Sequence, residues 1–152
     1  MMNLERMLGW FSRIRKAYAD NLDLHYGDYK LSPNEISILI MLSSNKNIDT
    51  GGQICVLLGV SKGLVSRSID SLIAHGLLVK RKDEFDKRIT HLQISKEAEP
   101  FIKEMRSQLK NINDEVYKDI DREELEQMES TILKIIDRFV KLEEKNNERK
   151  EK

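Results

Sequence analysis

The sequence predicts a mainly α-helical fold with one small β-hairpin, an α+β protein. Two short helices joined by a glycine turn are expected over residues 50–75, and a basic hairpin follows over residues 77–94. Apolar residues also recur at helical spacing near both ends of the chain. These observations together predict a winged helix-turn-helix flanked by long N- and C-terminal helices.

The first 22 residues predict one amphipathic helix. Trp10 lies off its apolar stripe, so we expect that ring to face a partner or a pocket. Residues 23–30 show little periodicity and are expected to form a loop that carries Gly27 and several rings. The apolar stripe of the helix consists of Leu4, Met7, Leu8, Phe11, Ile14, Tyr18 and Leu22.

Two capping boxes predict the next two helix starts. Ser32 precedes Pro33 and Glu35, and residues 45–47 are expected to end that helix. Thr50 and Gln53 repeat the pattern and open a short helix.

Short segments on either side of Thr50 leave alternatives. Ile48 and Asp49 are expected to form a brief strand beside the wing. Gly51 and Gly52 weaken the first helical turn, and they either let backbone amides approach a phosphate or simply serve the turn.

Residues 61–76 predict the reading helix of the motif. Ser61 can cap it, and Gly76 follows His75 where a left-handed residue usually ends a helix. One face is apolar, with Val65, Ile69, Leu72 and Ile73. The opposite face is polar, with Lys62, Gly63, Ser66, Arg67 and Asp70.

The wing is predicted from two strands around a charged hairpin. Residues 77–79 enter the first strand and residues 88–94 form the second, with imperfect alternation at Ile89, Leu92 and Ile94. The segment 80–88 between them is rich in Lys and Arg.

Two long helices are expected after the wing. Ser95 can cap the first and Asp121 the second, while the charged residues 143–152 are expected to fray. The apolar positions of the first are Ala98, Phe101, Ile102, Met105, Leu109, Ile112 and Val116, and those of the second are Leu125, Met128, Ile132, Ile135, Ile136, Phe139 and Leu142. The central lobe is too small to cover these stripes and that of the first helix, which favours a homodimer over a monomeric helical bundle.

Charge is distributed unevenly although the net charge is zero. Residues 61–96 hold eight Lys and Arg against four Asp and Glu, whereas residues 97–152 hold twelve against sixteen. The basic excess therefore coincides with the predicted reading helix and wing, where phosphate contacts need it. Segregation of charge on two solvated faces is the alternative explanation.

Composition argues against several other functions. The single cysteine, Cys55, cannot form an intrachain disulfide and is expected to be a buried structural thiol, consistent with a cytoplasmic protein. No signal peptide or membrane span is predicted. His25, His75 and His91 are widely separated, so neither a metal site nor a cofactor is expected. No phosphate loop or nucleophile motif indicates an enzyme.

The central region resembles the MarR family of bacterial and archaeal transcriptional regulators. The matching segments are VSKGLVSRSIDSLIAHGLLVKR, the wing signature Asp86-Lys87-Arg88, and HLQIS leading into a long helix. The resemblance covers about residues 31–101 by motif. Ala98 stands where the family often has Gly, and Gly63 replaces a longer polar residue that is often found there.

The resemblance implies a single domain that acts on double-stranded DNA as a homodimer, with a DNA-binding lobe at residues 31–95 and dimerisation helices at 1–22 and 96–146. It also implies that Asp86 orients an arginine reaching the minor groove. Arg67 is our first candidate for a base or phosphate contact. The expected DNA-binding residues are Thr50, Gln53, Ser61, Lys62, Gly63, Ser66, Arg67, Lys82, Asp86, Lys87 and Arg88.

The resemblance further implies a repressor on a palindromic operator and a cleft for a small aromatic or phenolic effector. The residues expected to line that cleft are Trp10, Arg13, Tyr18, His25 and Tyr26, although core packing for Tyr18 and surface exposure for His25 are alternatives. A winged-helix module that binds another protein is the rival function, because the net charge is zero and the wing carries Asp83 and Glu84.

Overall fold

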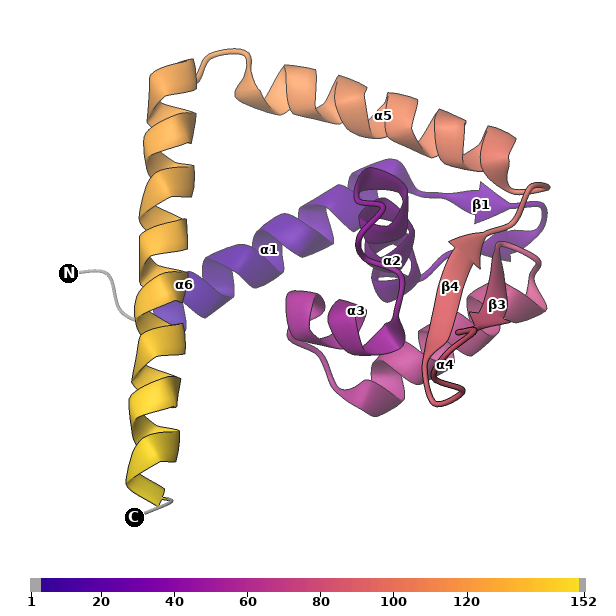
Figure 1. Ribbon diagram of the computed structural model, residues 1–152. Coiled ribbons are helices and arrows are strands. Elements are labelled where there is room, and N and C mark those ends of the chain that lie inside the picture. Colours follow the sequence, from indigo (N-terminus) through magenta and orange to yellow (C-terminus); the bar gives the residue numbers. More distant parts are fainter. Residues whose placement is uncertain (1–3, 151–152) are drawn as a thin grey trace. The chain divides into compact units, whose positions relative to one another are not determined.

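The computed structural model describes residues 4–150, apart from the side chains of residues 4, 8 and 148–150. The chain divides into two compact units, residues 1–112 and 113–152 (Figure 1). The first unit contains α1 (Leu4–Leu22), β1 (His25–Tyr26), β2 (Tyr29–Lys30), α2 (Pro33–Ser44), α3 (Gly51–Leu58), α4 (Lys62–Ala74), β3 (Leu78–Lys82) and β4 (Thr90–Ile94). Helix α5 (Glu99–Tyr117) runs from the first unit into the second, which also holds α6 (Arg122–Lys150).

Helix α2 is the centre of the first unit, because it contacts α1, α3, α4 and β4. Its predicted capping box is present: Ser32 Oγ accepts a hydrogen bond from Glu35 N, and Glu35 Oε2 accepts one from Ser32 N. Ile38 and Leu39 of this helix are completely buried. They join a core that also contains Ile54 of α3, Leu72 of α4, Leu78 of β3 and Met105 of α5.

The predicted loop at residues 23–30 is wrong, because this segment forms a small hairpin. Strands β1 and β2 pair antiparallel around Gly27, which has a φ of 62°. Leu24 and Leu31, on either side of the hairpin, are both buried, and Leu31 N donates to Leu24 O at 3.0 Å. Burial of these two leucines therefore closes a hairpin that is too short to show an alternating sequence pattern.

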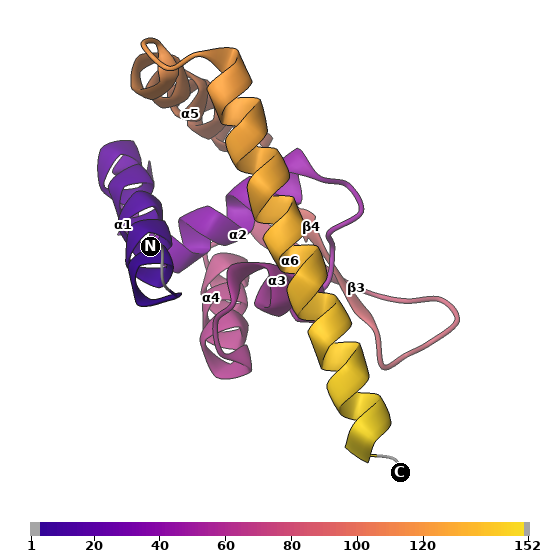
Figure 2. The same cartoon turned by 90° about the vertical axis from the view of Figure 1, so that its left-hand side faces the viewer.

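The wing has the predicted order but different boundaries. Strand β3 continues through Lys82, so Lys80, Arg81 and Lys82 lie in a strand rather than in the charged turn. Strand β4 begins at Thr90, which pairs with Lys82 and leaves a turn of seven residues. Figure 2 shows this hairpin projecting away from the helices of the first unit.

Two smaller expectations need similar corrections. Instead of a strand at residues 48–49, an isolated bridge joins Thr50 to His91, and Leu92 N donates to Asp49 O. Ser95 does accept a hydrogen bond from Ala98 N, but its hydroxyl also donates to Gly76 O, and α5 begins only at Glu99. Pro100 lies in the first turn of that helix, where its missing N–H costs little.

The predicted apolar stripes of the terminal helices are largely uncovered within one chain. In α1, Phe11 and Ile14 are exposed, and of the predicted stripe Leu4 and Leu8 lie outside the described side chains. In the second unit, α6 follows Asp121 as predicted, and none of its described side chains is buried. Its exposed apolar residues are Met128, Leu133, Ile136, Phe139, Val140 and Leu142.

No helix in the described part of the chain has the length and apolar character needed to span a membrane.

Candidate nucleic-acid interface

A tight turn sets α3 and α4 as consecutive helices of a helix-turn-helix. Gly59 ends α3 in the left-handed region, with a φ of 62°, and its N–H donates to Cys55 O. The Cys55 thiol, which is partly buried, donates to Val60 O at 3.0 Å. Ser61 then caps α4 by accepting a hydrogen bond from Leu64 N, as predicted. Cys55 therefore stabilises the turn between α3 and α4 through its backbone carbonyl and its thiol.

Helix α4 separates its residues into a buried and an exposed face. Val65, Ile69 and Leu72 are buried as predicted, and Ser68 joins them. Lys62 and Arg67 are exposed and form no ion pair with any described residue, so both cations are available to a partner. The other exposed residues of this face are Gly63, Ser66 and Asp70.

Gly63 leaves an open position on that exposed face. A methyl group added there would meet nothing within 4 Å, so packing does not require glycine at this position. Asp70, farther along, is bound by Lys80 of β3 at 2.9 Å, which links the end of the face to the wing. The available positive charge of α4 therefore lies in the first half of the helix, at Lys62 and Arg67.

Thr50 and Gln53 form the second predicted capping box, and Gln53 is heavily used within it. Gln53 Oε1 accepts from Asp49 N, Thr50 N and Thr50 Oγ1, and its Nε2 donates to Asn47 O. These local bonds hold the connection between α2 and α3. A role for Gln53 in DNA binding remains a prediction. To contact DNA, Gln53 would have to do so while keeping these local hydrogen bonds or by giving some of them up.

The two neighbouring glycines differ in their surroundings. A methyl group at Gly51 would lie 3.4 Å from Ile69 Cδ1, whereas one at Gly52 would meet nothing within 4 Å. Close packing of α3 on α4 therefore favours a small residue at Gly51, and Gly52 is left open to solvent or a ligand.

The wing turn holds its arginine through a carboxylate. Asp86 Oδ1 accepts from Arg88 N and Arg88 Nε, and Asp86 Oδ2 accepts from Arg88 Nη2 at 3.1 Å. These bonds from the guanidinium and the amide of Arg88 hold the pKa of Asp86 below its usual value. The Arg88 side chain is nevertheless 90% exposed. It is oriented by the protein and still open to a ligand, as the family resemblance implies.

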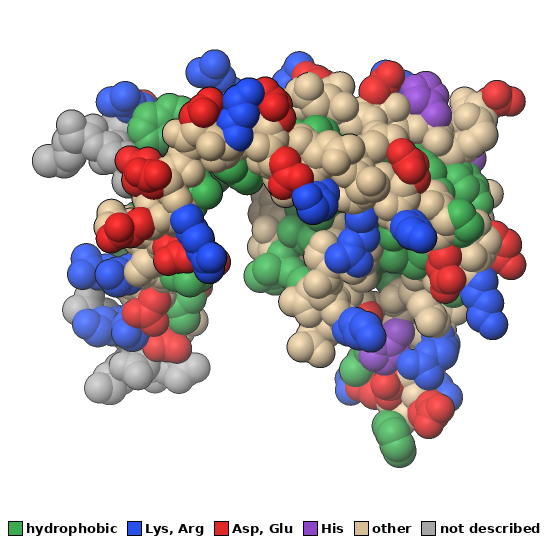
Figure 3. All heavy atoms as spheres, turned by 90° about the horizontal axis from the view of Figure 1, so that it is seen from above, with side chains coloured by type: hydrophobic (Ala, Val, Ile, Leu, Met, Phe, Trp, Pro, Cys, Tyr) green, Lys and Arg blue, Asp and Glu red, His purple; other side chains and the backbone are tan. Residues whose placement is uncertain are grey.

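The remaining lysines of the wing are also accessible. Lys82 Nζ donates to Thr90 Oγ1 across the two strands, and Lys87 Nζ approaches Asp83 O at 3.4 Å. Figure 3 shows positive and negative side chains intermixed over the face of the first unit that it presents, without a large area of one sign. Any electrostatic attraction to DNA must therefore come from particular cations of α4 and the wing.

A histidine clamp, which we define as Asp49, Asp83 and His91, joins the base of the wing to the connection before α3. His91 Nδ1 lies 2.8 Å from Asp49 Oδ2, and His91 Nε2 lies 2.9 Å from Asp83 Oδ2. Hydrogen bonds to Asp83 and to Asp49 raise the pKa of His91. The Asp86 amide, the His91 imidazole and the Phe85 amide together lower the pKa of Asp83 to about 2.

Sequence reasoning missed this clamp because its members are 42 and 8 residues apart. The available signal was the predicted approach of residues 48–49 to the wing, which places Asp49 beside His91. Among the described residues, no three His, Cys, Asp or Glu side chains gather in a way that could hold a metal ion.

The five residues expected to line an effector cleft have varied surroundings. Trp10 and Arg13 are exposed on α1, and the Arg6 guanidinium lies 5.2 Å from the centre of the Trp10 ring. Tyr18 is half-buried. On the hairpin formed by β1 and β2, Tyr26 packs edge-on against Phe101 of α5. His25 is exposed, and its Nε2 lies 3.5 Å from Asp23 Oδ1.

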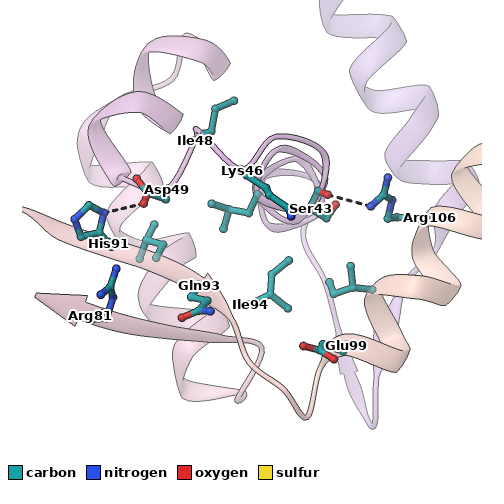
Figure 4. A pocket seen from close by; sticks show the side chains of 13 residues that line it. Ser43, Lys46, Ile48, Asp49, Arg81, His91, Gln93, Ile94, Glu99 and Arg106 are labelled. Atoms are coloured by element: carbon teal, nitrogen blue, oxygen red, sulfur yellow. Dashed lines mark hydrogen bonds and ion pairs between the residues drawn. The ribbon is translucent and has the colours of Figure 1, made fainter. Parts of the chain in front are cut away.

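A pocket of about 500 Å³ lies elsewhere in the first unit, and none of those five residues lines it. It opens between the end of α2, the wing strands and the start of α5, with Asp49 and His91 of the clamp at one end (Figure 4). Its charged lining combines Lys46, Arg81 and Arg106 with Asp49 and Glu99. This mixture of signs favours no single class of ligand.

Comparison with known proteins agrees with this geometry. Residues 29–89 match the sequence model of the MarR family. A MarR transcriptional regulator from Methanosarcina mazei Go1 is similar in structure, with a TM-score of 0.70, 15% identity, and coverage of 91% of this chain and 97% of that one. The transcriptional regulator BldR from Sulfolobus solfataricus has a TM-score of 0.64, 22% identity, and coverage of 91% and 99%.

The adhesin competence repressor AdcR from Streptococcus pyogenes is a third similar structure, with a TM-score of 0.56, 22% identity, and coverage of 91% and 98%. The helix-turn-helix, the paired strands that follow it and the long flanking helices define a winged-helix protein of the DNA-binding type. Over residues 29–89, which include both helices of the helix-turn-helix and the first strand of the wing, the chain matches the MarR family. Members of this family are transcriptional regulators and not enzymes.

Proposed function

We propose that this protein is a homodimeric transcriptional repressor that binds a palindromic operator in double-stranded DNA. The proposal depends on one observation, which is that both α4 and the wing present exposed cations. Lys62 and Arg67 on α4 form no ion pair with a described residue. Arg88 on the wing is held by Asp86 but remains accessible. A helix that enters the major groove and a wing arginine in the minor groove are consistent with this arrangement.

Each residue group has a proposed part. Arg67 reads a base edge or binds a phosphate, and Lys62 and Ser66 position the helix on the backbone. The proposed contacts with the DNA backbone also include four residues at or near the starts of α3 and α4, which are Thr50, Gln53, Ser61 and Gly63. Lys82, Lys87 and Arg88 serve the wing, with Asp86 as the residue that positions Arg88.

The exposed apolar residues of α1 and α6 support a dimer. Within one chain these residues are exposed to solvent, which is unfavourable for a protein that stays monomeric; they include Phe11, Ile14, Ile136 and Phe139. We assign residues 1–22 and 96–146 to dimerisation and residues 31–95 to DNA binding. Two symmetry-related α4 helices then read half-sites about one DNA turn apart. The expected location is the cytoplasm, where such DNA is found.

Repression is supported by one similar protein, the adhesin competence repressor of Streptococcus pyogenes. For the effector we propose a small aromatic acid or phenol, because Trp10 and Arg13 offer an exposed ring and an exposed cation on α1. Thermal-shift screening of such compounds tests this part separately. A panel without any stabilising compound would contradict it.

Selection of bound duplexes from a random pool is the experiment that tests the main proposal. A palindromic consensus is expected, and Arg67→Ala should weaken binding to it while the fold is retained. Binding should also fall steeply with salt, because Lys and Arg contacts release condensed counterions. Weak, salt-insensitive binding without a consensus would contradict the proposal.

Weak, salt-insensitive binding to DNA would instead favour a module that binds another protein. One observation gives this alternative some support: Val56 and Leu57 of α3 are exposed, so the helix-turn-helix carries an apolar patch as well as its cations.

A further inference from the structure

Phe85 is the most exposed large apolar side chain in the described part of the chain, at 95%. It lies in the seven-residue turn of the wing, next to Asp86 and Arg88. A single exposed apolar residue needs no explanation by itself. What distinguishes Phe85 is how firmly its backbone is held and which groups surround it.

Hydrogen bonds to one carboxylate fix the turn that carries Phe85. Asp83 Oδ1 accepts from both Phe85 N and Asp86 N at 2.8 Å, while Asp83 Oδ2 is bound by His91 of the clamp. Asp83 N donates to Ile89 O and Ile89 N donates to Asp86 O, which closes the turn. The turn therefore presents the ring outward, and its backbone cannot easily rearrange to cover it.

The charges around Phe85 favour a polyanion as its partner. Asp83 and Asp86 are occupied by hydrogen bonds from His91 and Arg88, so their charges are largely compensated. The exposed Lys82 and Lys87 remain, against the single carboxylate of Glu84, so this end of the wing keeps an excess of positive charge. The minor groove of a DNA duplex has phosphates along its sides, and a base step that opens there exposes the apolar faces of its bases.

We propose that Phe85 is an apolar wedge that enters the minor groove beside Arg88 and presses into a base step. Insertion of this kind partly unstacks the step and bends the duplex, and flexible pyrimidine–purine steps such as TA and CA allow it at the lowest cost. The wing then reads the deformability of DNA in addition to any groove contact of Arg88. This inference rests on the proposed DNA binding and names a further residue of that interface.

The test uses the full-length protein and a duplex obtained by selection from a random pool, with 2-aminopurine placed at successive positions under the wing. Wild-type binding should raise the 2-aminopurine fluorescence at one step. Phe85→Ala should abolish that rise and weaken binding about tenfold or more, the scale of burying one large apolar side chain. Phe85→Leu should retain much of both effects.

The dependence of binding on salt separates an apolar wedge from an ionic contact. Phe85→Ala should leave the slope of affinity against salt concentration unchanged, whereas Arg88→Ala should reduce it by about one phosphate equivalent. Glu84→Ala is the matched control, since it shortens the adjacent exposed side chain; it should retain the fluorescence rise. Because Phe85 covers no protein surface, its substitution should not change the unfolding temperature.

The outcomes distinguish this inference from the proposed function. If wild-type protein binds with steep salt dependence and Phe85→Ala binds equally well, the wedge is refuted and DNA binding stands. A loss of affinity without a wild-type fluorescence rise would show surface contact and would refute insertion. If wild-type protein binds no duplex in a salt-dependent manner, the proposed function and the wedge fail together.

Discussion

His91 Nε2 lies 2.9 Å from Asp83 Oδ2, so the second strand of the wing is attached directly to the residue that organises the wing turn. The other ring nitrogen of His91 binds Asp49, which precedes α3. Neutral imidazole carries one N–H, whereas imidazolium carries two. The doubly bonded clamp therefore requires a protonated His91, and this gives the wing a dependence on pH.

The first prediction is that the clamp opens as pH rises. The pKa of His91 is raised in the folded protein, so protonated His91 stabilises the folded state. This stabilisation is complete below the unfolded pKa of about 6.5 and is lost as pH rises through the folded pKa. We expect the amides of Phe85 and Asp86 to lose protection from hydrogen exchange above that pH, relative to the exchange rate of an unfolded chain at the same pH. Hydrogen exchange combined with an NMR titration of His91 measures both changes.

His91→Ala is the control for this prediction. It should leave those two amides weakly protected from exchange at every pH, without the pH-dependent change in protection. At acid pH a second loss is expected, because Asp83 has its pKa lowered to about 2 and its contribution falls as pH drops from about 3.8 through that value. Protection of the Phe85 and Asp86 amides that does not change with pH in the wild type would contradict the role of the clamp.

The second prediction concerns Asp86, which positions Arg88 by two guanidinium bonds. Asp86→Ala should weaken DNA binding by about fivefold or less, the range expected for an exposed ion pair. Arg88→Ala should weaken it more. In the Arg88→Ala background, the Asp86 substitution should have no further effect if positioning is its function. Equal losses that add in the double variant would show that Asp86 acts independently.

A third prediction concerns Glu35, a carboxylate with only 2% exposure at the centre of the first unit. Burial raises the pKa of Glu35, but hydrogen bonds from Tyr29, Ser32 and Ser71 outweigh burial and keep it below the usual value. Glu35→Gln should lower the free energy of unfolding by about 1–3 kcal/mol, because a buried amide must face donors that a carboxylate accepted.

Urea unfolding measures that change. The control is Tyr29→Phe, which removes one donor to Glu35 and leaves the capping bond from Ser32 N intact. It should cost less than Glu35→Gln. Identical stabilities for wild type and Glu35→Gln would contradict the importance of this network.

The fourth prediction tests the proposed dimer through α6. Ile136→Glu should weaken dimerisation by at least about tenfold, because burial of an unpaired carboxylate in an apolar contact is costly. Sedimentation velocity at several concentrations measures the association. Gln127→Glu is the matched control, since it places the same side chain on the opposite face of the helix. A wild-type protein that sediments as a monomer would refute the dimer itself.

Much of the fold could be predicted from local sequence signals. Ser32, Thr50 and Ser61 were identified as helix caps, and each accepts the expected backbone hydrogen bond. Of the predicted apolar face of α4, Val65, Ile69 and Leu72 are buried and Ile73 is partly buried. These features are determined within one or two helical turns, so spacing alone reveals them.

The errors share a different cause. The hairpin around Gly27 depends on burial of Leu24 and Leu31 by the rest of the first unit, and the extension of β3 to Lys82 depends on pairing with Thr90. In both segments a partner distant in sequence or in the core overrides weak local preference. Gln53 is a different case: its contact with DNA remains a prediction, and its amide also binds Asn47, Asp49 and Thr50, which are close to it in the sequence.

The sequence by itself determined the order of helices, the reading helix with its polar face and the Asp86–Arg88 signature, because periodicity, caps and motifs are properties of neighbouring residues. The tertiary structure alone decided that His91 lies between Asp49 and Asp83, and that Asp83 also holds the turn presenting Phe85. Hydrogen bonds between side chains far apart in sequence leave no periodic trace. They form when packing of the core brings the wing to the start of α3.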